Sequence, residues 1–189
     1  MKKSKLMMLN FMALSIVLGI VSKKIMNPFA NLITEALHIP GGISTGFSIM
    51  FLVIAAEIIK FSCYDSYDGM AEKCGLLMGT VQGMVTLALG RVGSMGILMP
   101  LGFIATGAAI DLVYYVTKHF NCSKQERMVF ANSFAALMAS VTANIIVFHL
   151  WGPVLMLYLC VSAVSGMIYG FLASAVVVRV EPVFYQYSY

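Results

Sequence analysis

The stretch GLLMGTVQGMVTLALGRVGSMGILMPLGFIATGAAIDLVYY, residues 75–115, consists of two apolar runs separated by a short turn. Its charged residues are Arg91, in that turn, and Asp111, near the end of the second run. A run of about 20 apolar residues is long enough to cross a bilayer as a helix. The stretch therefore predicts two membrane helices joined by a tight turn, with one carboxylate inside the second helix.

The rest of the chain has the same character. Of its 189 residues, 60% are hydrophobic and 11% are charged, whereas a soluble domain has about 25% charged residues. The basic residues lie at the ends of apolar runs and form no aromatic-interleaved patch, which excludes nucleic acid as a partner. These features predict an all-α integral membrane protein, a compact bundle of six transmembrane helices forming a single domain. The expected spans are about 6–22, 43–60, 74–90, 94–117, 128–150 and 154–178.

The distribution of positive charge predicts the orientation in the lipid bilayer. With the N-terminus inside, nine basic residues fall on the cytoplasmic side, and Lys23, Lys24 and Arg91 fall outside. The positive-inside rule therefore predicts a multi-pass protein with both termini cytoplasmic. The longest outer loop is then about 23–42, which is either a connector or a lid whose apolar positions 29–37 form a short amphipathic helix.

Enzyme motifs are missing from the sequence. There is no GxSxG nucleophile elbow, no HExxH zinc pair and no Walker loop, and His38, His119 and His149 lie in separate segments. The cysteines form no CxxC or zinc pattern. We therefore expect a protein that is not an enzyme, with no catalytic residues, no metal and no cofactor.

Polar and aromatic residues gather in the outer half of the predicted bundle. At membrane depth, polar side chains either bond between helices or face a water-filled site. As a set they favour a pocket that opens outward under the loop 23–42. The candidate substrate-binding residues are Gln82, Asn144, His149, Trp151, Tyr158, Ser162, Glu35 and His38. Glu35, His38 and Gln82 would suit a cationic or hydrogen-bonding heterocycle.

Three features together resemble the substrate-binding S component of energy-coupling factor (ECF) vitamin transporters. They are the six short helices, the long first outer loop with Ile39-Pro40-Gly41-Gly42-Ile43, and the stretch 75–115, which looks most like the hydroxymethylpyrimidine/thiamine type. The resemblance implies a subunit of an ECF-type ABC importer in the bacterial cytoplasmic (inner) membrane. It would capture a vitamin or vitamin precursor and dock on a transmembrane coupling subunit driven by two ATPase subunits. Family members dock through an Ala-x-x-x-Ala stripe on the first helix, for which this chain offers Ser15-x-x-x-Gly19.

Asp111 lies about seven residues, roughly 10 Å of helix, before Lys118 at the cytoplasmic end. A buried carboxylate there needs a partner or a proton, and Arg127 or Lys73 could supply the partner. We therefore expect Asp111 and Arg127 to form a buried ion pair or coupling element. Substrate contact and a proton relay are the alternatives for Asp111, and Glu57 near Lys60 is similar but better able to reach water.

The sequence is also compatible with two other functions. A small structural membrane scaffold would need no pocket and no ligand. A stand-alone secondary transporter would usually show an internal repeat and ionisable residues near the midplane.

Overall fold

The computed structural model describes residues 3–37, 43–62, 69–90, 93–120 and 122–186. This part of the chain is helical throughout and contains no strand, so the all-α membrane bundle is confirmed. Short segments connect the long helices: α3 (Gly69–Glu72), a 3₁₀ helix (Gly93–Leu98) and a π-helix (Thr142–Val147). The long helices are α1 (Lys3–Leu37), α2 (Ile43–Ser62), α4 (Cys74–Ala88), α5 (Met99–Thr117), α6 (Lys124–Val141) and α7 (Pro153–Gln186).

Five of these six helices are long and apolar enough to cross a bilayer. The exception is α4, whose 15 residues extend about 22 Å at 1.5 Å per residue, short of the ~30 Å hydrocarbon core. The turn after α4 holds Gly90 with φ 67°, a left-handed conformation that favours glycine. The helical hairpin predicted for 75–115 is therefore present, with a short first arm.

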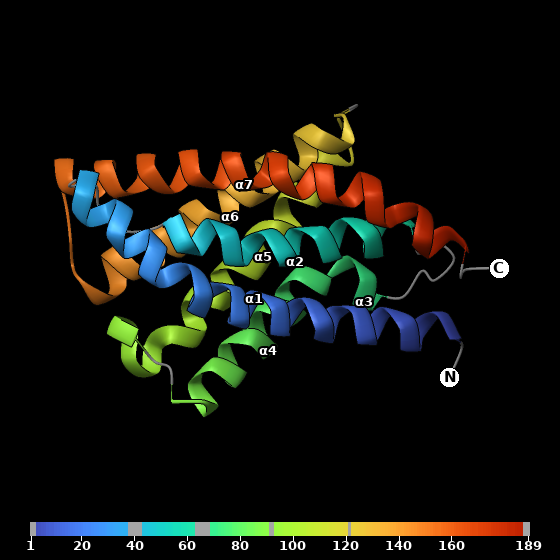
Figure 1. Cartoon of the computed structure of the whole chain (residues 1–189), viewed down its shortest axis with the longest axis horizontal. Helices are drawn as coiled ribbons and strands as arrows, with labels where there is room; N and C mark the ends of the chain where they lie inside the picture. The colour runs from blue at the N-terminus through green and yellow to red at the C-terminus, as the bar shows by residue number, and fades with distance from the viewer. Residues whose placement is uncertain (1–2, 38–42, 63–68, 91–92, 121, 187–189) are drawn as a thin grey trace.

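The first helix differs from its predicted span. α1 runs unbroken from Lys3 to Leu37, so residues 23–37 continue the helix. The loop predicted to begin at 23 is therefore wrong over this range, whether as a connector or as a lid with its own helix. Pro28 lies inside α1; proline there removes one backbone hydrogen bond and favours a kink without ending the helix. The second half of α1 leans away from the line of the first half (Figure 1). Residues 38–42 of the predicted loop lie outside the described residues.

The six helices lie roughly along one long axis, with the start of α1 and the end of α7 at the same end of the bundle (Figure 1). The opposite end carries the start of α7, the 3₁₀ segment and the end of α1. α2 is the most enclosed span, with 67% of its most apolar window buried, and Leu52, Val53 and Ile58 are at most 1% exposed. The other helices therefore surround α2.

Glycines bring α4 and α5 into backbone contact. A Cβ atom built at Gly79 would lie 2.3 Å from the carbonyl oxygen of Phe103, and one at Gly107 would lie 2.3 Å from that of Gly75. Lipid gives helices no hydrophobic reason to associate, so such close approach gains dispersion and weak hydrogen bonds. The glycines at spacings of four in the stretch 75–83 thus have the packing role that their spacing predicted.

The same arrangement joins α6 and α7. A Cβ at Gly166 would lie 2.6 Å from the Cα of Ser133, and one at Gly170 would lie 2.6 Å from the Cα of Val129. The Asn132 side chain, fully buried on α6, donates to the carbonyl of Gly166 across 2.8 Å. Two tightly packed hairpins therefore flank α2.

Gly79→Ala is expected to lower the stability of the fold by about 1–3 kcal/mol, the usual cost of overpacking. The methyl group would meet a backbone carbonyl, so two helices would have to separate. This loss should exceed the gain of up to about 1 kcal/mol that alanine brings to a helix interior. Chemical unfolding in mild detergent measures the difference.

Gly102→Ala is the matched control, because its Cβ would meet the flexible side chain of Met95 at 3.3 Å. It should change stability by less than Gly79→Ala. Equal losses for the two variants would show that close backbone approach at Gly79 is not the cause.

Candidate functional site

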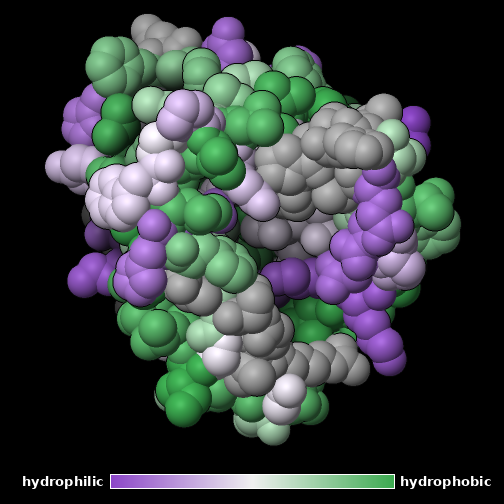
Figure 2. Space-filling model, turned by 90° about the vertical axis from the view of Figure 1, so that its left-hand side faces the viewer, coloured by the Kyte–Doolittle hydropathy of each residue, from purple (hydrophilic) through white to green (hydrophobic). Residues whose placement is uncertain are grey.

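A cavity of about 690 Å³ lies between the helices at the end opposite to the start of α1. Helices α1, α2, α4, α5 and α7 and the α6–π-helix segment all contribute to its wall. Figure 2 views this end and shows hydrophilic side chains bordering a depression among hydrophobic ones. The polar and aromatic lining residues are Lys23, Lys24, Asn27, Thr45, Ser48, Gln82, Thr86, Phe103, Thr106, Ser140, Asn144, Phe148, Tyr158 and Ser162.

Four of the predicted site residues meet in this cavity. Gln82 comes from α4, Asn144 from the π-helix, and Tyr158 and Ser162 from α7. Gln82, Asn144 and Ser162 are each at most 4% exposed. These four side chains line one cavity, and their contact with a ligand remains a prediction.

The other predicted site residues lie elsewhere. Glu35, His149 and Trp151 are exposed and do not line the cavity, so their inclusion in the pocket was wrong, and His38 lies outside the described residues. The continuation of α1 moves Glu35 two turns beyond Asn27, the last cavity residue of that helix. After the π-helix, His149 adopts φ 49° and the chain turns outward, leaving Trp151 71% exposed, as expected of an interfacial residue.

The amide of Gln82 has a fixed orientation. The hydroxyl of Ser48 donates its proton to the carbonyl of Gly19 across 2.7 Å, so its oxygen can only accept from Gln82 Nε2, 3.4 Å away. The other amide atom, Oε1, is buried without a hydrogen-bond partner among the described residues. A buried acceptor without a donor is costly, so Gln82 is an unsatisfied polar group in the cavity wall.

The π-helix shapes the wall around Asn144. Its wider turn is closed by the Phe148 N–H, which donates to the carbonyl of Ala143 across 3.3 Å. Asn144 Nδ2 donates to the carbonyl and hydroxyl oxygens of Ser140, at 2.9 and 3.0 Å. Single π turns inside α-helices occur frequently at functional sites. Hydropathy patterns carry no signal for such a turn, and it was not predicted.

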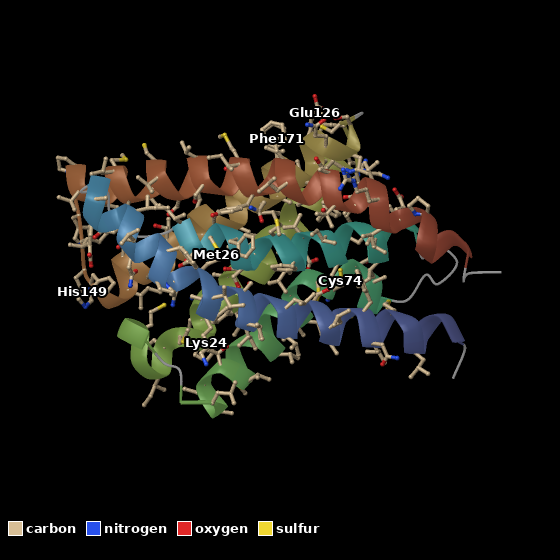
Figure 3. All side chains as sticks on the ribbon, in the orientation of Figure 1. Lys24, Met26, Cys74, Glu126, His149 and Phe171 are labelled. Carbon is tan, nitrogen blue, oxygen red and sulfur yellow. The ribbon has the colours of Figure 1, made fainter. Side chains whose placement is uncertain are left out.

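The two lysines of the cavity were also missed as site residues. Lys23 is partly buried and Lys24 is exposed, and Figure 3 shows Lys24 at the same end of the bundle as His149. The sequence interpretation treated both as loop charges on the outer side. Both lie on the predicted outer side, where the positive-inside rule expects few basic residues. This exception was a signal that could have identified them as site residues.

The small-residue patch on the first helix faces inward. Ser15 is 3% exposed, and a Cβ at Gly19 would lie 2.9 Å from Gln82 Nε2. The predicted use of Ser15 and Gly19 as a partner-docking surface is therefore wrong, because both pack inside the bundle. The exposed side of α1 carries large apolar side chains such as Leu14 and Val17.

Asp111 belongs to an ion pair at the opposite end, with a different partner from those predicted. Its carboxylate lies 2.9 Å from Lys60 Nζ and accepts hydrogen bonds from the backbone N–H groups of Gly75, at 3.0 Å, and Leu76, at 2.7 Å. These are among the first N–H groups of α4, which have no partner within their own helix. Asp111 therefore caps the neighbouring helix.

Arg127 pairs with Glu57 instead of Asp111. Arg127 Nη2 lies 2.8 Å from Glu57 Oε1, and the Glu57 side chain is 2% exposed. The expectation that Glu57 reaches water was wrong, because α2 is the central helix. Two separate ion pairs therefore replace the expected pair between Asp111 and Arg127. Cys74, next to the Asp111-capped start of α4, is labelled in Figure 3.

Comparisons of this chain with protein-family models, curated proteins and solved structures gave no match.

Proposed function

We propose that the chain is a membrane-embedded substrate-binding subunit that captures a small vitamin-like molecule from outside for uptake. The observation that carries the proposal is the cavity of about 690 Å³, within the 300–1,000 Å³ typical of small-molecule sites. Residues with buried amide or hydroxyl groups line it from α2, α4, α5, the π-helix and α7.

The lining suits a flat, partly polar molecule. Phe103, Phe148 and Tyr158 offer aromatic faces, which stack on heterocycles and bury much area with little loss of conformational entropy. Gln82 and Asn144 supply the few polar contacts that fix orientation in such sites. A vitamin or vitamin precursor combines these two requirements.

ATP-driven uptake would require partners, because the chain has no Walker loop of its own. In the arrangement that the resemblance to ECF S components implies, a transmembrane coupling subunit and two ATPase subunits supply the energy. The cavity would then face the outside of a bacterial inner membrane. The start of α1 and the end of α7, which lie at the opposite end of the bundle, would be cytoplasmic. This orientation also places the larger share of basic residues inside.

The experiment that tests binding works with an unidentified substrate. The protein is purified in mild detergent, denatured, and the released small molecules are identified by mass spectrometry. Candidates are then added back while the melting temperature is followed, since a molecule that binds only the folded state raises it. A scaffold without a ligand would release nothing in stoichiometric amount and would not be stabilised by any candidate.

Gln82→Leu and Tyr158→Ala are each expected to weaken binding of the released molecule at least about tenfold. The first removes a buried hydrogen-bond acceptor and the second an aromatic face, and about 1.4 kcal/mol corresponds to a tenfold change. Isothermal titration of the purified variants provides the measurement.

Trp151→Ala is the matched control, because Trp151 is a large exposed aromatic outside the cavity. Its affinity should equal that of the unmodified chain. Affinity lost in Trp151→Ala and kept in the two cavity variants would move the site to the surface near Trp151.

A further inference from the structure

The charge of the cavity wall is positive. Lys23 and Lys24 line it, and no aspartate or glutamate does among the described residues. The ion pairs within this part of the chain join Lys60, Lys124 and Arg127 to carboxylates. Across the described ranges, the two cavity lysines therefore have no carboxylate partner.

Lys23 is held close to the cavity's polar wall. It lies one helical turn after Gly19 on α1, and the backbone at Gly19 touches the Ser48 hydroxyl and approaches the Gln82 amide. Its Nζ atom lies 5.4 Å from the centre of the Phe103 ring, a cation–π contact that only partly replaces water. Lys23 and Gln82 thus line the same cavity.

An ammonium group without a counter-ion is expensive inside a membrane protein. Removing it from water costs far more than removing a neutral polar group, and lysines at membrane depth are usually paired or functional. Lys24 adds a second positive charge at the more exposed part of the wall. An anion entering the cavity would supply the missing partner for both.

We propose that the substrate of this cavity carries an anionic group, a carboxylate or a phosphate, bound by Lys23 with the help of Lys24. This inference rests on the proposed function and replaces the cationic heterocycle that Glu35 suggested, because Glu35 does not line the cavity. Lys23 acts as a substrate-specificity residue.

A lipid headgroup phosphate could present the same chemistry, so the test separates the two sources. The wild-type chain and the variants Lys23→Gln, Lys23→Arg and Lys118→Gln are purified, in detergent and in nanodiscs with and without phosphatidylglycerol. Lys118 is an exposed lysine beyond the opposite end of α5, so its variant controls for the loss of one positive charge. Molecules released on denaturation are identified by mass spectrometry.

The expected result is a soluble acid, released in near one-to-one amount from the wild-type chain and from Lys118→Gln. Lys23→Gln should retain at least about tenfold less of this acid, which is the effect of losing one charge-assisted hydrogen bond. Lys23→Arg should retain most of the acid. Without ligand, Lys23→Gln should melt at or above the wild-type temperature, because it removes an unpaired ammonium. That result shows that lost binding does not reflect lost folding.

Melting temperatures with paired probes provide the second readout. Each pair consists of an acid and a closely similar molecule with a neutral group in place of the carboxylate. The pairs are nicotinate and nicotinamide, pantothenate and pantothenol, and biotin and biotinamide. Only acids should stabilise the wild-type chain, and Lys23→Gln should lose that response.

Each contrary result has one meaning. A neutral or cationic molecule bound in stoichiometric amount overturns the anionic assignment and leaves the binding function standing. A phosphatidylglycerol molecule held through Lys23 overturns the assignment of a soluble substrate. No released molecule together with no stabilisation by any probe overturns both the inference and the proposed function.

Discussion

Arg127→Met is expected to lower the free energy of unfolding by about 3–5 kcal/mol, the range measured when one member of a buried ion pair is removed. The reason is the environment of Glu57, whose carboxylate lies on the central helix and is 2% exposed at its side chain. Its Oε2 atom already lacks a partner among the described residues. Arg127 also stacks 4.0 Å above the Phe61 ring, a contact that methionine only partly replaces. Denaturant titration of the purified chain, followed by circular dichroism, measures the loss.

The double variant Glu57→Leu/Arg127→Met separates charge from packing. Replacing both members of a buried pair with apolar side chains is often neutral or stabilising, so most of the lost stability should return. Losses that instead add up in the double variant would show that Glu57 and Arg127 act independently, and that the ion pair is not what stabilises the contact between α2 and α6.

Asp111→Asn is the second large expected effect, also about 3–5 kcal/mol of lost stability. Asparagine has no charge to offer Lys60, and an amide NH2 would replace one of the two carboxylate oxygens that accept from Gly75 and Leu76, so one backbone N–H would face a donor. The start of α4 would then have an unsatisfied N–H group and lose a favourable charge near its positive end. The affinity for ligand should stay unchanged, because the cavity lies at the opposite end of the bundle.

Glu72→Gln is the control for Asp111→Asn. It makes the same change from acid to amide at an exposed side chain of α3. Lys60 donates to the backbone carbonyl of Glu72 and not to its carboxylate. Its stability should match that of the unmodified chain. If Asp111→Asn keeps its thermal stability and loses ligand affinity, Asp111 contacts the substrate and the cavity is not the site.

The ion pairs and the cavity lie at opposite ends of the bundle. At the end that holds α3, carboxylates of Glu57 and Asp111 are matched by Arg127 and Lys60, which stabilises the packing of α2, α4, α5 and α6. At the other end, Lys23 and Gln82 have no such partners among the described residues. Paired charges suit a structural role, and a cavity lysine without a carboxylate partner suits the proposed binding role.

Several candidate residues were predictable from spacing alone. Gln82 is an amide in a span of glycine, threonine and apolar residues, and Tyr158 and Ser162 recur at helical spacing, so a shared interior face was the natural expectation. Trp151 and His149 have equally suitable chemistry but lie after the π-helix, where the chain turns away. Residue type indicated candidates, and the local path of the backbone decided which of them reach the cavity.

The sequence by itself determined the class of the protein and the approximate positions of its helices. Apolar runs near 20 residues, punctuated by glycine and charge, are a local property, and a bilayer leaves few options other than helix for such runs. Only the tertiary structure decided that α1 continues through Pro28, that Ser15 and Gly19 face inward, and that Asp111 pairs with Lys60. These outcomes depend on the rotation of each helix about its axis and on its neighbours, and packing across distant segments sets both.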